Sequence, residues 1–171
     1  MTKYALIFCL LCLGASGAAA ADFPKAEIFG GYQYTHLEGS GGASGWNFAL
    51  NGNFNDWAGI TADIGSAYTT SNGVSFDNYT VTFGPVLADR QHKAYTPFVH
   101  ALIGVDHASA GVFNFSTSSS GLALLAGGGV DARVNQLIAV RVAQVDWMLV
   151  HGSGGTSSKN VRISFGVVFR F

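Results

Sequence analysis

The chain has 171 residues, a formal net charge of −1 and 49% hydrophobic residues. That length fits a single domain, and its nine Lys and Arg residues form no run or stripe of the kind that binds nucleic acid. Both cysteines, Cys9 and Cys12, lie close to the start, which excludes disulfides, thiol catalysis and cysteine metal sites from the chain after residue 21.

Residues 1–21 have the layout of a cleavable secretory signal. Lys3 supplies a positive start, "YALIFCLLCLG" an apolar run, and "ASGAAAAD" the small residues that end in Ala-x-Ala. The apolar run is shorter than the roughly 20 residues that a membrane-spanning helix requires. We therefore predict cleavage after Ala20 or Ala21 and a mature domain of residues 22–171.

The mature domain consists of segments in which apolar and polar residues alternate, as in strands with one apolar face. In the second segment, for example, Trp46 and Phe48 alternate with Asn47 and Ala49, and an amide is unsuited to a hydrophobic sandwich core. The pattern predicts eight strands, at residues 26–36, 45–54, 57–68, 78–88, 95–108, 121–134, 138–150 and 159–171.

Two of these strands depart from strict alternation. Phe98 falls on the polar side of the fifth strand. In the seventh, the apolar residues change phase between Val142 and Val145. A β-bulge near Ala143 would restore the alternation and place Arg141, Gln144 and Asp146 together on the inner face.

The predicted connections alternate between short and long. "FNDW" (54–57), "DRQHKA" (89–94) and "VNQL" (134–137) are short, whereas "LEGSGGASG" (37–45), "TTSNGVSFD" (69–77), "SAGVFNFSTSSSG" (109–121) and "HGSGGTSSK" (151–159) are longer and rich in Gly and Ser. This alternation is typical of outer-membrane barrels, with turns in the periplasm and loops outside. Because lipid contains no water to satisfy unpaired backbone groups, the sheet must close. The predicted fold is an all-β, eight-stranded antiparallel up-and-down transmembrane β-barrel.

With the signal, the eight strands and the terminal "FRF", residues 22–171 resemble the small outer-membrane β-barrel proteins of the OmpA transmembrane domain and OmpX type. The resemblance implies a bacterial outer-membrane location, contact with outer-membrane lipids, and passage through periplasmic chaperones and the barrel assembly machinery. It also implies that the last strand carries an assembly signal made of Phe165, Val167, Phe169 and Phe171. We expect a monomer without cofactor or metal.

An eight-stranded barrel encloses an interior just wide enough to be filled by side chains. Strand parity points nine charged side chains inward: Glu27, Asp63, Asp106, Asp131, Arg133, Arg141, Asp146, Arg162 and Arg170. Charges in such a place require partners, so we expect a network that plugs the lumen, with a proton relay or gated ion path as the alternative. Replacing Arg133 or Arg141 should then leave carboxylates unpaired.

Three further groups of residues could form a site or a membrane interface. His107 and Ser109 share one strand face and resemble the catalytic pair of outer-membrane lipid A deacylases, but no third group is available nearby to orient the imidazole. The five histidines (His36, His92, His100, His107 and His151) show no metal-ligand spacing and are expected at interfaces or in loops. Eleven aromatic residues cluster toward strand ends, as in membrane-interface belts: Tyr32, Tyr34, Trp46, Phe54, Trp57, Tyr68, Tyr79, Tyr95, Trp147, Phe169 and Phe171.

These patterns predict a non-enzymatic outer-membrane protein with a structural or surface-interaction role carried by its extracellular loops. The surface ligand is not specified by the sequence. The alternatives are a narrow porin or small-solute channel and, from a third class, a lipid-modifying outer-membrane enzyme.

Overall fold

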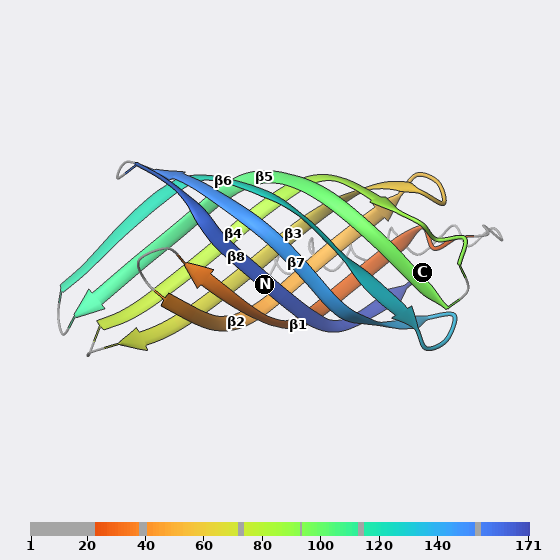
Figure 1. The fold of residues 1–171 in the computed structure, drawn as a ribbon, viewed down its shortest axis with the longest axis horizontal. Helices are drawn as coiled ribbons and strands as arrows, with labels where there is room; N and C mark the ends of the chain where they lie inside the picture. Colours follow the sequence, from red (N-terminus) through yellow and green to blue (C-terminus); the bar gives the residue numbers. More distant parts are fainter. Residues whose placement is uncertain (1–22, 38–40, 72–73, 93, 113–114, 153–154) are drawn as a thin grey trace, which may run out of the picture.

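The computed structural model describes residues 23–37, 41–71, 74–92, 94–112, 115–152 and 155–171, which form eight strands. The strands are β1 (Ala26–Leu37), β2 (Gly41–Asn53), β3 (Ala58–Ser71), β4 (Val74–Ala88), β5 (Tyr95–Val112), β6 (Phe115–Arg133), β7 (Ile138–Gly152) and β8 (Gly155–Arg170). Each strand pairs antiparallel with the next, and β1 also pairs with β8, from Glu27 opposite Arg170 to His36 opposite Val161. The predicted eight-stranded up-and-down barrel is confirmed (Figure 1). In the described residues, no helix has the length and hydropathy needed to cross a membrane.

The two ends of the barrel differ. The connections 54–57, 89–94 and 134–137 lie at the same end as the close of β8, on the right in Figure 1, and we call this the turn end. The opposite end, where β1 runs toward β2 and β3 toward β4, is called the loop end. In bacterial barrels of this kind the turns face the periplasm and the loops face outward.

The two faces of the sheet have opposite character. On β8, Ile163 and Phe165 point away from the barrel and are exposed, while Arg162, Ser164 and Arg170 point inward and are buried. A soluble barrel would have the reverse arrangement. The apolar outer face therefore suits lipid, and the polar groups gather in the lumen.

The β-bulge predicted near Ala143 is confirmed. Arg141 lies opposite Gly166 and Gln144 opposite Ser164, so two residues of β7 face a single residue of β8. The bulge returns Gln144 and Asp146 to the lumen, where both are buried with Arg141. Phe98 also points inward, as its parity predicts.

The predicted long loops are largely strand, which corrects the expected boundaries. β5 and β6 have 18 and 19 residues and pair as far as Val112 opposite Phe115. The Gly- and Ser-rich stretches form strands because ladder hydrogen bonds need only the backbone, so composition alone misplaced their ends. The connections at 38–40, 72–73, 113–114 and 153–154 lie outside the described residues.

Two of the short turns are stabilised by the same kind of side-chain-to-backbone hydrogen bonding. The side chain of Asn55 accepts hydrogen bonds from the backbone N–H groups of Trp57 (3.0 Å) and Ala58 (2.6 Å). Asn135 does the same for Leu137 and Ile138, at 2.8 Å each. An Asn side chain that satisfies local backbone donors stabilises a tight turn, which explains the recurring Phe/Val-Asn pattern at these positions.

Apolar side chains fill the lumen at two levels. Leu102, Leu125 and Met148 pack together toward the loop end. Phe29 and Val168 pack together toward the turn end. The polar groups described below lie between and beyond these two apolar layers.

A charge placed on the outer face should destabilise the barrel according to its depth. Phe83 is on the lipid-facing side of β4, between Val81 and Pro85, and is 59% exposed. Phe83→Arg should cost about 2–4 kcal/mol of unfolding free energy, whereas Phe54→Arg in the 54–57 turn should cost about 0–1 kcal/mol. Urea unfolding in lipid vesicles measures both, and equal losses would contradict the assignment of the outer face to lipid.

Candidate functional site

The central polar cluster of the lumen is built around Arg162 of β8. Its Nη1 donates to Asp63 Oδ1 of β3 at 2.7 Å. Its Nε and Nη2 donate to Asp146 Oδ2 of β7 at 2.9 and 2.7 Å. All three side chains are buried. Because β3 and β8 are separated by two strands on one side and four on the other, this guanidinium bridges the interior of the barrel.

Amides and one histidine complete this central cluster. Gln144 Nε2 donates to Asp146 Oδ2 at 2.7 Å, and Asn47 Nδ2 donates to Asp63 Oδ2 at 2.9 Å. His100 Nε2 lies 2.7 Å from Asp146 Oδ1. The expectation that every histidine lies at an interface or in a loop is therefore wrong for His100, which is buried because a carboxylate supplies its partner.

Glycines make room for these large polar groups. A Cβ on Gly65 would lie 3.0 Å from Arg162 Nη1 and 2.8 Å from Gln33 Oε1. A Cβ on Gly127 would collide with the carboxylate of Asp146. Because the lumen is narrow, the position that faces a guanidinium or a carboxylate has no room for a side chain and is a glycine.

A second cluster surrounds Arg141, nearer the turn end. Arg141 forms a two-point ion pair with Asp131, with Nε–Oδ1 at 2.8 Å and Nη2–Oδ2 at 3.2 Å. Its Nη1 donates to Gln144 Oε1 at 2.7 Å, which links the two clusters. The guanidinium also lies 4.3 Å from the ring centres of both Phe29 and Phe98. The inward aromatics thus flank a cation, an arrangement that favours Arg over Lys.

The third cluster is centred on Glu27 of β1. Arg90 Nη2 lies 3.2 Å from Glu27 Oε2, and Arg170 Nε lies 3.1 Å from Glu27 Oε1. Asn53 Nδ2 donates to Glu27 Oε2 at 3.2 Å and accepts from Arg90 Nη2 at 2.6 Å. Sequence parity missed Arg90 because it lies in a turn, where alternation does not apply, and its direction depends on the path of the 89–94 connection.

Two of the nine predicted inward charges lie apart from these clusters. Asp106 accepts from Asn78 Nδ2 at 2.7 Å on the loop-end side of the Leu102–Met148 layer. Arg133 is half-buried and forms no ion pair with any residue that the structure describes. Replacing Arg133 should therefore cost less stability than strand parity suggests, because among the described residues it pairs with no buried carboxylate.

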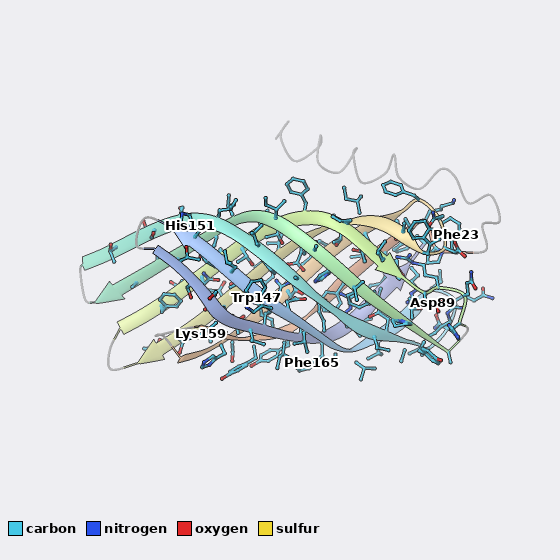
Figure 2. All side chains as sticks on the ribbon, turned by 45° about the horizontal axis from the view of Figure 1, so that its top comes forward. Phe23, Asp89, Trp147, His151, Lys159 and Phe165 are labelled. Atoms are coloured by element: carbon cyan, nitrogen blue, oxygen red, sulfur yellow. The ribbon has the colours of Figure 1, made fainter. Side chains whose placement is uncertain are left out.

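The residues of the expected assembly signal lie along the outer face of β8 and just beyond it. Phe165, Val167, Phe169 and Phe171 are all exposed. Figure 2 places Phe165 midway along the barrel. The Phe171 N–H donates to the Ala26 carbonyl at 2.8 Å, and the Phe171 carbonyl accepts from Lys25 N–H at 2.6 Å, so the β1–β8 pairing continues past the strand ends.

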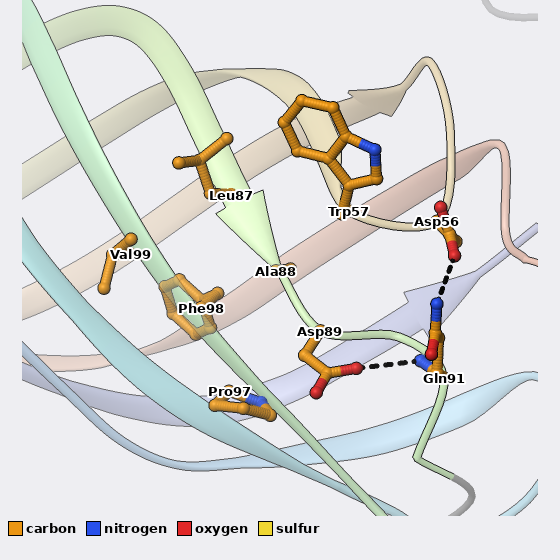
Figure 3. A pocket seen from close by; sticks show the side chains of 9 residues that line it. All are labelled: Asp56, Trp57, Leu87, Ala88, Asp89, Gln91, Pro97, Phe98 and Val99. Atoms are coloured by element: carbon orange, nitrogen blue, oxygen red, sulfur yellow. Dashed lines mark hydrogen bonds between the residues drawn. The ribbon is translucent and has the colours of Figure 1, made fainter.

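The predicted aromatic side chains are all exposed on the outer face, in two groups. In Figure 2 His151 and Lys159 lie toward the loop end, Trp147 lies nearer the middle of the barrel, and Asp89 lies at the turn end. A hollow of about 580 Å³ opens on the outer wall at the turn end, beside Trp57, Leu87 and Val99 (Figure 3). Gln91 borders it and hydrogen-bonds to Asp56. The hollow has an apolar wall and a polar rim, as expected at a membrane interface.

The structure gives His107 a partner other than the expected Ser109. His107 Nδ1 lies 2.8 Å from Ser120 Oγ on β6, and its hydrogen bond does not go to Ser109. Among the described residues no acidic side chain contacts the ring, and no group of three His, Cys, Asp or Glu side chains is placed to hold a metal ion.

Comparison with known proteins identifies the architecture. Residues 5–171 match the family model described as outer membrane protein beta-barrel domain. Comparison with curated proteins found no significant match. Among solved structures, Ail of Yersinia pestis, in complex with the heparin analogue sucrose octasulfate, is 20% identical with a TM-score of 0.61, covering 85% of this chain and 97% of that one.

Two further structures have the same fold. Neisserial surface protein A is 15% identical with a TM-score of 0.67, covering 88% of this chain and 98% of that one. OprG from Pseudomonas aeruginosa is 12% identical with a TM-score of 0.58, covering 89% and 99%. At these identities the likeness establishes the fold alone.

The two arginines near the turn end should differ in their contribution to stability. Arg141→Ala removes both hydrogen bonds to the buried Asp131 carboxylate, which keeps only the 3.7 Å contact with Arg170 Nη2, and should cost about 3–5 kcal/mol, whereas Arg133→Ala should change stability by less than about 1 kcal/mol. The measurement is the urea midpoint of each barrel refolded in detergent. A similar loss in both variants would argue against the pairing of Arg141 with Asp131 as the source of the effect.

Phe171 should matter more for assembly than for stability. Its deletion should impair insertion in cells, because the terminal aromatic resembles an assembly signal, yet cost at most a few kcal/mol in refolded barrel, given its limited burial. Phe171→Trp and Phe171→Tyr should be tolerated and Phe171→Asp should not. Heat-modifiable gel mobility of outer-membrane fractions, beside the same variants refolded in vitro, gives both readouts. Normal membrane levels of the deletion variant would exclude an assembly role.

Proposed function

Because the chain belongs to the outer membrane protein beta-barrel domain family, we propose that it acts as a surface-interaction protein of the bacterial outer membrane. The proposed binding surface is the loop end of the sheet itself. Individual loops contribute less to this surface than the sequence suggested. Strands occupy most of the residues that were expected to form loops. The observation that carries the proposal is an open strand edge on β6.

The β5–β6 hairpin extends beyond the apolar outer face. Among the side chains that the structure describes, Val105 opposite Leu122 is its last pair with two exposed large apolar residues. Seven more pairs follow, from Asp106 opposite Gly121 to Val112 opposite Phe115. At about 3.3 Å per residue, these pairs add about 23 Å of strand length beyond the apolar band. His107 and Ser120 begin the polar outer face of this extension, so it suits water and not lipid.

One side of this extension has no neighbouring strand. Pairing of β6 with β7 begins at Gly121 opposite Gly152, so residues 115–120 pair with β5 alone among the described residues. This edge carries no Pro, no Lys and no bulge, the features that natural proteins use to block edge-to-edge pairing. A backbone edge of this kind is a template for an added strand. The partner we propose is an extended segment of another protein.

The loop end has few charged side chains with which to recognise a partner by charge complementarity. Beyond Arg162, Lys159 is the one Lys or Arg in the described loop-end segments. The Ail structure was solved with a sulfated sugar analogue. A cluster of cations suited to such a polyanion is not found among the described residues at the loop end of this chain, which favours recognition through backbone hydrogen bonds.

The lumen supports a binding role over conduction. Arg162 joins β3, β7 and β8 through ion pairs of 2.7 Å, and Arg141 continues the network toward the turn end. Moving an ion through this layer would require breaking buried ion pairs, which is costly. Stepwise single-channel conductance of the intact barrel in planar bilayers would contradict this part of the proposal.

If a partner binds through backbone hydrogen bonds, proline and alanine substitutions at the β6 edge should have different effects on binding. Peptides selected from a random displayed library against the barrel in nanodiscs should protect the amides of residues 116–120 from hydrogen exchange. Binding should survive Ser118→Ala and Ser119→Ala, because neither removes a backbone donor. Consecutive N–H groups of a strand point to opposite sides, so only one of residues 118 and 119 donates to the open edge. Because proline has no N–H, binding should be lost in one of the two variants Ser118→Pro and Ser119→Pro.

Heat-modifiable mobility confirms that each variant is folded. Loss of binding in both alanine variants would show that side chains carry recognition. Full binding by both folded proline variants would show that the edge is not used.

A further inference from the structure

The turn end of the lumen carries a surplus of positive charge. Its buried or half-buried ionic groups are four guanidiniums and two carboxylates, from Arg90, Arg133, Arg141, Arg170, Glu27 and Asp131. Asp131 accepts two hydrogen bonds from Arg141, and its Oδ2 also lies 3.7 Å from Arg170 Nη2. Glu27 is shared between Arg90 and Arg170. Two positive charges therefore remain uncompensated within this part of the described structure.

Several of these guanidinium groups also lack hydrogen-bond partners. Arg170 is 2% exposed; its Nε and Nη2 lie 3.1 Å from Glu27 Oε1 and 3.7 Å from Asp131 Oδ2 without hydrogen-bond geometry, and its Nη1 has no partner among the described residues. Arg90 is 5% exposed, and its Nε and Nη1 are equally unsatisfied. The Nε of Arg133 is buried and unsatisfied too. Buried donors on a cation are costly to leave unpaired, so this arrangement calls for an acceptor that carries negative charge.

The remaining described carboxylates near this end do not supply it. Asp56 accepts from Gln91 Nε2 at 2.9 Å. Asp89 lies 2.9 Å from His92 Nδ1 and is half-exposed. Both belong to the connections that border the outer hollow in Figure 3, and neither has an ion pair with a lumen arginine. The surplus inside the barrel is thus separate from the acidic rim outside it.

We propose that Arg90, Arg133 and Arg170 form a binding site for a small oxyanion, of the phosphate class, at the turn end of the lumen. The three side chains come from the 89–94 connection, the end of β6 and the end of β8, so the closed sheet brings them to one mouth of the barrel. Guanidiniums present forked donors that match the oxygens of such an anion. Arg133 is only half-buried, which gives the site access to solvent on the periplasmic side.

The proposed site is distinct from the strand edge at the loop end. The apolar layer of Leu102, Leu125 and Met148 and the Arg162 cluster lie between them. Failure of one proposal therefore leaves the other standing.

The test uses the intact barrel refolded in a non-ionic detergent and inorganic phosphate as the probe. A ligand that binds only the folded state raises the unfolding temperature in a saturable manner. Sodium phosphate should raise it more than sodium chloride at matched ionic strength. Arg133→Gln should reduce the phosphate-specific shift at least about twofold while keeping the fold, because Arg133 holds no carboxylate. Lys159→Gln, at the other end of the barrel, should keep the full shift.

Equilibrium dialysis with radiolabelled phosphate provides a second readout that does not depend on stability. It should show saturable binding to wild type and to Lys159→Gln, and weaker binding to Arg133→Gln and Arg90→Gln. Equal effects of phosphate and chloride on wild type, together with no saturable binding in dialysis, would overturn the proposal. Undiminished binding in folded Arg133→Gln would also overturn it, because the anion would then lie elsewhere.

Discussion

The absence of water in the hydrocarbon layer is the constraint on which the rest of this structure depends. A backbone N–H or C=O that faces lipid cannot find a partner in solvent, so the sheet has to close, and β8 returns to pair with β1 over ten residue pairs. The same constraint sets the polarity of the two faces. Apolar side chains such as Phe83 and Phe165 point outward, and the ionic groups of the Arg162, Arg141 and Glu27 clusters are directed into a narrow lumen.

The lumen consequently becomes a polar core that must satisfy its own hydrogen bonds. At its centre this is achieved for the charged groups, since Arg162 has two carboxylate partners and those carboxylates have further contacts with Asn47, Gln144 and His100. At the turn end it is not achieved, because four guanidiniums, those of Arg90, Arg133, Arg141 and Arg170, face only two buried carboxylates among the described residues. A buried network that is complete stiffens a protein, and one that is incomplete marks a place where a ligand or solvent has to contribute.

Beyond the lipid the constraint is lifted, and the sheet changes accordingly. Water can satisfy an open edge there, so residues 115–120 of β6 extend with one side unpaired. Over the same stretch, residues 116–120 are all Ser or Thr. The β5–β6 hairpin thus has a lipid-facing part and a water-facing part. The pair Val105 and Leu122 marks the boundary between them.

Sequence alone determined the strand number, the closure, the outward face and the bulge near Ala143, because each follows from a two-residue period and from the demand that lipid contact apolar side chains. It did not determine the strand ends, since Gly- and Ser-rich segments pair as readily as they loop and only the neighbouring strand decides which occurs. Nor did it reveal which inward charges meet. Arg162 contacts Asp63 across 99 residues of chain, Arg90 enters the lumen from a turn, and Arg133 remains without a carboxylate. Parity specifies a direction for each side chain, whereas the register and curvature of the closed sheet set the distances between them.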